Sequence, residues 1–143
     1  MTRRQNELVA NLNQRIIMER FLGSRIVANP EAIDGLSIPE GSIAMRFAPD
    51  EIYVSPPVDA SAVLTADPHA IVINEGAFSG AWVAEAQALS LLEMHAEWEM
   101  PKERPAFDQG SVAGVATKLL FMDGKVLFMT PSPYAQELED RLS

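Results

Sequence analysis

The sequence contains no cysteine among its 143 residues and only two histidines. The missing thiols exclude a disulfide framework, a cysteine-based zinc site and a thiol nucleophile. Positive charge is also scarce, because 11 Lys and Arg stand against 20 Asp and Glu and give a net charge of −9. Nucleic-acid and anionic-membrane binders need clustered positive charge, so we expect neither kind of partner.

Long apolar runs are missing as well. No stretch approaches the ~18 consecutive apolar residues of a membrane-spanning helix. The basic start Met1–Arg4 is followed by polar residues instead of the apolar core of a signal peptide. We therefore expect a cytoplasmic protein. Hydrophobic residues still make up 48% of the chain, enough for a core, and the length predicts a single domain over residues 1–143.

Residues 1–25 are predicted to form an N-terminal amphipathic helix, which is clearest over residues 4–22. Apolar side chains recur at helical spacing at Leu8, Leu12 and Ile16. Five arginines and two glutamates give this segment a charge of +3, which leaves −12 for the rest. Because an apolar stripe must be covered, we expect these three residues to contact the rest of the domain or a second copy of the chain.

The body of the chain, residues 42–142, alternates short apolar runs with turn residues. After a loop over 28–41, strands are predicted over 43–47, 51–54, 70–73 and 78–82, with a turn at 74–76 and a helix over 83–94. A second loop is predicted over 101–110, which contains two prolines and a glycine.

The strongest local signal is the pair Asp123-Gly124, which is typical of a tight hairpin turn. It is flanked by predicted strands over 111–122 and 125–130. Both faces of these strands are apolar close to the turn, so we expect them to lie inside the sheet and to be covered on both sides.

The chain ends in a predicted helix with Ser132 as its cap and Pro133 at its first position. Its inner face is predicted to carry Tyr134, Leu138 and Leu142. The order of elements predicts an α+β fold, with an antiparallel or mixed sheet and helices packed on one face.

Residues 92–100 alternate between apolar and polar side chains and fit either a helix or a strand. On a strand, Glu93, His95, Glu97 and Glu99 would share one face and could hold a divalent metal or perform acid/base chemistry. In a helix His95 would point away from Glu93 and Glu97, and the glutamates would form an ordinary solvated surface.

Two cations lie within otherwise apolar predicted strands, Arg46 and Lys118. A buried cation requires a partner, so either residue could bind a carboxylate or another anion; the alternative is that both protect sheet edges. Trp82 and Trp98 are interpreted as core residues, with an exposed aromatic at a partner interface as the alternative. His69 follows Asp-Pro and is interpreted as a turn or surface residue, and less favourably as a catalytic base.

Over about residues 42–142 the chain resembles the gamma subunit of heterotetrameric sarcosine oxidase. The segments that carry the resemblance are MRFAPDEIYV (45–54), FDQGSVA (107–113), LLFMDGKVLFMTP (119–131) and YAQEL (134–138). That family is similar to folate-binding aminomethyltransferase and YgfZ-like folds, which are α+β. The resemblance implies a non-catalytic subunit that needs no cofactor of its own and pairs with larger flavoprotein subunits.

Three functional hypotheses follow. The first is a non-catalytic subunit or interaction domain, paired with flavoprotein subunits or with itself, and Trp98 joins the N-terminal stripe as a candidate contact. The second is a stand-alone binding domain for a folate or small carboxylate, held by Arg46 or Lys118. The third is a metal-dependent or acid/base enzyme built on His95 and its neighbouring glutamates. The sequence contains no phosphate-binding glycine loop or nucleophile elbow, as the first hypothesis expects.

Overall fold

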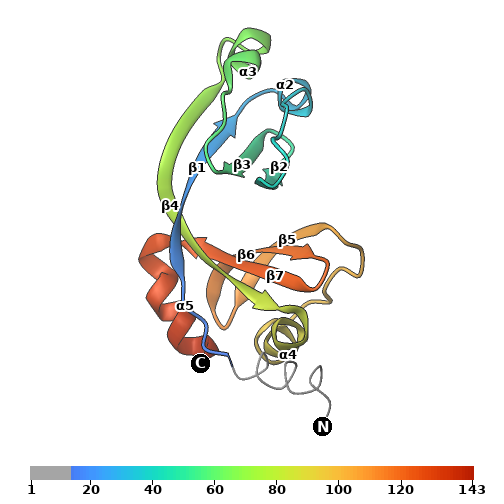
Figure 1. Cartoon of the computed structure of the whole chain (residues 1–143), viewed down its shortest axis with the longest axis vertical. Helices are drawn as coiled ribbons and strands as arrows, with labels where there is room; N and C mark the ends of the chain where they lie inside the picture. Colours follow the sequence, from blue (N-terminus) through green and yellow to red (C-terminus); the bar gives the residue numbers. More distant parts are fainter. Residues whose placement is uncertain (1–13) are drawn as a thin grey trace. The chain divides into compact units, whose positions relative to one another are not determined.

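A computed structural model describes residues 14–143, and its elements fall into two compact units (Figure 1). Residues 21–77 form the unit that we call the β1–β3 unit, and residues 14–20 and 78–143 form the β5–β7 unit. Strand β4 (Ile71–Ala84) contributes its first half to one unit and its second half to the other. The class is α+β, dominated by antiparallel strand pairing.

In the β1–β3 unit the strand order is β2–β3–β1–β4. The bounds are β1 Glu19–Val27, α2 Pro30–Asp34, β2 Ile43–Ala48, β3 Glu51–Ser55 and α3 Ser61–Ala66. The register sets Tyr53 of β3 opposite Arg25 of β1 and Met45 of β2. On the other face of these strands, Ile26 and Ile52 pack with Ile33 of α2 and Val63 of α3. Burial of this apolar face joins the two short helices to the sheet.

In the β5–β7 unit the second half of β4 is followed by β7, β6 and β5 in the order of the sheet. The bounds are α4 Glu85–His95, β5 Ala106–Val112, β6 Val115–Met122, β7 Lys125–Pro131, the 3₁₀ turn η1 Ser132–Tyr134 and α5 Ala135–Leu142. One core joins Leu119, Phe121 and Phe128 of the strands to Leu92 of α4 and Leu138 of α5.

Several sequence predictions are confirmed. Strands β2 and β3 match the predicted runs, and α4 covers most of the predicted helix over 83–94. The Asp123-Gly124 turn joins β6 to β7, and Gly124 has a φ of 78°. The strands beside it are buried on both faces, as predicted, at Leu119, Leu120, Phe121, Val126, Leu127 and Phe128.

The prediction of an N-terminal helix is wrong for the part of that segment that the structure describes. Residues 19–22 belong to β1, while Leu8 and Leu12 lie outside the described residues. Gly23, which fits a helix end in sequence, is instead a strand residue covered by the ring of Tyr53. A Cβ at Gly23 would lie 2.6 Å from Cε2 of Tyr53, so only glycine allows this packing.

Strand β4 is longer than predicted. Residues 74–76 were expected to turn, but they continue a single strand from Ile71 to Ala84. Beyond them β4 pairs with β7, from Phe78 opposite Pro131 to Ala84 opposite Lys125. In the sheet β4 also lies beside β1, so pairing with strands distant in sequence outweighs the local preference of Asn-Glu-Gly for a turn.

A second hairpin was missed between residues 106 and 122. It consists of β5 and β6, which pair around Ala113-Gly114, so the predicted strand over 111–122 is two strands and the predicted loop over 101–110 ends at residue 105. Ala113 and Gly114 have φ values of 51° and 79°, as a tight hairpin turn requires. Alanine rarely adopts a positive φ, which makes this turn a weak sequence signal.

Four smaller predictions also fail. Helix α2 lies inside the predicted loop over 28–41, with Pro30 in its first turn and Gly35 at its end, the residues that favour those positions. Leu138 and Leu142 are buried as predicted, but Tyr134 is 51% exposed. Ser132 is the first residue of η1 and not its cap, which is Pro131, and the Ser132 hydroxyl lies 2.9 Å from that of Ser79. Trp82 is exposed, and Lys125 Nζ lies 4.1 Å from its ring centre.

The contact between Gly23 and Tyr53 gives a direct test of the β1–β3 unit. Gly23→Ala should lower the free energy of unfolding by about 1–3 kcal/mol, because the added methyl group displaces a fully buried ring. Gly35→Ala is the matched control, since its Cβ would lie 3.7 Å from the nearest atoms and meet no clash. Urea denaturation of both variants checks this, and equal midpoints would contradict it.

Candidate functional site

Arg46 forms an ion pair and hydrogen bonds within the β1–β3 unit. Its Nη1 lies 2.8 Å from Oδ1 of Asp34, and Nη2 donates to the carbonyl oxygens of Pro30 at 3.3 Å and Pro49 at 2.5 Å. Nε donates to Pro49 as well, at 3.1 Å. The guanidinium therefore joins the start of α2 to the turn between β2 and β3, which provides the partner that a cation in an apolar strand requires.

Beside these two segments lies a depression that we call the loop-end hollow, with a volume of about 590 Å³. The segment after β1, the β2–β3 turn and the α3–β4 connection form its rim. The lining residues are Val27, Ala28, Asn29, Pro30, Pro49, Asp50, Asp67, His69 and Ile71.

Hydrogen bonds fix the segments of this rim to one another. The buried carboxylate of Asp67 accepts from the backbone N–H of Asn29 at 2.8 Å and from that of His69 at 3.0 Å. The N–H of Ala28 donates to the carbonyl oxygen of Asp50 at 3.0 Å. Together with Arg46, these bonds hold all three segments of the rim in place before any ligand binds.

The chemistry of the hollow combines apolar walls with two carboxylates and one imidazole. His69, Asp50 and Ile71 are exposed, whereas Asp67 is only 6% exposed. His69 is thus a surface residue in a turn closed by Asp67, as the sequence suggested. That His69 shares a hollow with Asp50 could not be predicted from local sequence, because strand pairing brings the two turns together.

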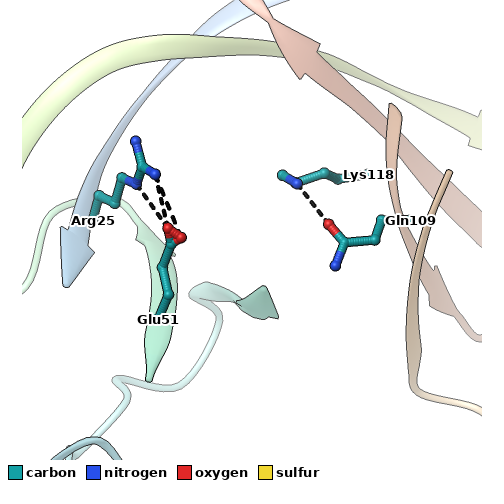
Figure 2. A network of polar contacts seen from close by, with 4 residues as sticks. All are labelled: Arg25, Glu51, Gln109 and Lys118. Carbon is teal, nitrogen blue, oxygen red and sulfur yellow. Dashed lines mark hydrogen bonds and ion pairs between the residues drawn. The ribbon is translucent and has the colours of Figure 1, made fainter. Parts of the chain in front are cut away.

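Lys118 lies in the β5–β7 unit, directly opposite Gln109 in the strand register. Its Nζ donates to Oε1 of Gln109 at 2.7 Å (Figure 2). These two residues and Ser111 line a second depression, the Lys118 hollow, of about 510 Å³. Lys118 and Arg46 belong to different units, so each must be considered alone as a ligand-binding candidate.

Figure 2 also shows an ion pair within the β1–β3 unit that the sequence analysis did not identify. Nη2 of Arg25 lies 2.8 Å from Oε1 of Glu51, and Nε donates to the same oxygen at 3.2 Å. Arg25 had been assigned to the predicted N-terminal helix. In β1 its side chain instead meets Glu51 diagonally across a strand pair, a contact that adds modestly to the stability of the sheet.

The acidic segment after residue 92 does not form the strand on which the metal hypothesis depended. Glu93 and His95 belong to α4, whereas Ala96 is extended and Glu97 and Glu99 follow it. Within residues 14–143, no group of three or more His, Asp or Glu side chains is close enough to hold a metal ion.

The candidate contact residues divide between the core and the surface. Ile16 is buried in the β5–β7 core. Trp98 is half-buried against the same core, donates through Nε1 to Oδ2 of Asp108 at 2.7 Å, and covers Gly110. The sequence analysis missed the exposed apolar side chains of α4, Leu89 at 39% and Met94 at 73%.

Tyr53 is a buried polar side chain of the β1–β3 unit, and the charge of Glu75 affects its pKa. Tyr53 is fully buried, and its ring stacks on that of Phe47 with 6.0 Å between centres. Burial raises the pKa of Tyr53 above its ordinary value of 10.0, and the charge of Glu75 raises it further, while a hydrogen bond with Ser55 opposes both. Among residues 14–143, Oε1 of Glu75 has no hydrogen-bond partner although that atom is buried.

No protein-family model matches this sequence, and no curated protein matches it. Within the described part of the chain, no helix is both long and apolar enough to cross a bilayer.

The buried phenol predicts an alkaline loss of stability. A tyrosine with a raised pKa keeps its stabilising effect below pH 10.0, and loses it as the pH rises through the folded-state pKa, because the unfolded chain releases the proton first. Urea midpoints measured from about pH 8 to about pH 11 should fall more steeply in the wild type than in Tyr53→Phe. Tyr134→Phe, which removes a half-exposed phenol, should follow the wild type. Parallel curves for wild type and Tyr53→Phe would refute the assignment.

Proposed function

We propose that this chain is a non-catalytic subunit or interaction domain, as its resemblance to the sarcosine oxidase gamma subunit implies. The observation that carries the proposal is that α4 exposes two large apolar side chains while it buries a polar one. Gln87 is 8% exposed, and its Nε2 donates to the carbonyl oxygen of Gln14 at 2.7 Å. Met94 and Leu89, by contrast, are turned to the solvent, where an isolated domain would carry polar side chains.

Exposed methionine suits a contact surface because its unbranched, polarisable side chain adapts to the shape of a partner. Glu93, between Leu89 and Met94 in sequence, is also exposed and adds negative charge to this helix. A complementary partner would present an apolar pocket with a basic rim. We assign this role to a larger flavoprotein subunit, and self-association is the competing outcome.

The mass of the native complex tests the proposal. The chain purified gently from its own cells should carry a stoichiometric larger chain that contains flavin. Met94→Lys should reduce the amount of that chain at least about tenfold, because a buried, unpaired charge costs more than 1.4 kcal/mol. Leu64→Lys introduces the same charge at an exposed apolar residue of α3 and should retain the partner. A wild-type chain recovered without a larger chain, or equal losses in both variants, would count against the proposal.

A second candidate function is the binding of a small carboxylate or folate in the Lys118 hollow. It is favoured by the position of Lys118 Nζ beside the amide of Gln109 in a hollow that Ser111 also lines. An ammonium group and an amide N–H can together donate two hydrogen bonds to one carboxylate. Such charge-assisted bonds are stronger than bonds between neutral groups.

Calorimetric titration with succinate and with folic acid tests the second function. The wild-type chain should release heat and saturate with at least one of these acids, whereas Lys118→Gln should bind about tenfold more weakly. Lys102→Gln removes a charge from a fully solvated side chain and should bind like the wild type. Flat titrations of the wild-type chain would remove the support for this function.

A further inference from the structure

We propose that the loop-end hollow is a binding site for a small primary amine with an apolar body. Its ammonium group would lie against Asp50 and Asp67, and its apolar part against the wall that includes Val27 and Ile71. This site belongs to the β1–β3 unit and is independent of both the α4 surface and the Lys118 hollow.

The apolar wall is the first argument. More than half of the lining residues are apolar: Val27, Ala28, Pro30, Pro49 and Ile71. Ile71 is 54% exposed although it belongs to a strand, so a large apolar side chain faces an open depression. Binding sites for small molecules characteristically combine such walls with a few convergent polar groups.

The negative charge of the residues that line the hollow is the second argument. Asp50 and Asp67 line the hollow, and neither lysine nor arginine is among its lining residues. Asp67 accepts one backbone N–H on each carboxylate oxygen, which leaves further lone pairs on both oxygens for an ammonium donor. Because Asp67 is nearly buried, a cation beside it would compensate a charge that has been removed from water.

The fixed rim is the third argument. Asp67 joins the segment after β1 to the α3–β4 connection, and Arg46 joins the start of α2 to the β2–β3 turn. A ligand that enters a rim already held by hydrogen bonds loses little free energy to the ordering of loops. Arg46, identified from sequence as an anion-binding candidate, acts here as a positioning residue outside the lining of the hollow.

Three probes of similar shape and different charge test the proposal on the full chain: benzylamine, benzyl alcohol and benzoate. In amide-resolved NMR titrations, benzylamine should shift the signals of Asn29, His69 and Ile71 and saturate them. Benzyl alcohol should shift the same signals with an affinity about tenfold lower, because it lacks the charge-assisted hydrogen bonds. Benzoate should not bind, since the two carboxylates repel it.

The variant Asp50→Asn should weaken benzylamine binding about tenfold, while Asp123→Asn removes an equal charge from the β6–β7 turn and should leave it unchanged. Since Asp50 is exposed and its backbone supplies the structural hydrogen bond, this variant should retain the native fold. Arg46→Gln adds a test of the rim, and should weaken benzylamine and benzyl alcohol by the same factor. Absence of saturation with benzylamine, equal binding of benzoate, or equal effects of Asp50→Asn and Asp123→Asn would each overturn the proposal.

Discussion

The carboxylate of Asp67 is the contact on which the loop-end hollow depends. It is nearly buried, and its two oxygens satisfy backbone N–H groups from segments about forty residues apart in sequence. A buried acceptor that loses its donors costs about 1–3 kcal/mol, and more when it is charged. Separating the two segments would leave the carboxylate of Asp67 without these donors, so the cost of that state helps to hold the segments together. The walls of the hollow consequently share the stability of the strands that flank them.

The sequence predicted the elements whose signal is local and missed those that depend on distant pairing. The Asp123-Gly124 hairpin and strands β2 and β3 have turn residues and apolar spacing that suffice on their own. Residues 19–22 and 74–76 have local patterns that favour a helix and a turn, but pairing across the sheet makes both segments strands. The β5–β6 hairpin was missed because its turn contains Ala113, and the positive φ of that residue is rare for alanine.

For the candidate sites, too, local sequence predicts some features and misses those that depend on distant elements. That a cation in an apolar strand needs a partner was predictable for Arg46 and Lys118, but the identity of the partner was not, because it lies on another element. The loop-end hollow had no sequence signal, since its lining comes from three separated segments. Apolar residues occur on every side of α4, so periodicity could not distinguish Met94 on the surface from Leu92 in the core.

The exposure of Met94 has a chemical consequence. The chain has no thiol, so its methionine thioethers are the sulfur groups that an oxidant can reach. Met45 and Met129 are fully buried, whereas Met94 is open to solvent. Conversion of Met94 to the sulfoxide would place a polar, chiral group on the surface that we propose as the partner contact. Methionine sulfoxide reductases reverse that conversion, so association through α4 would respond to the oxidative state of the cell.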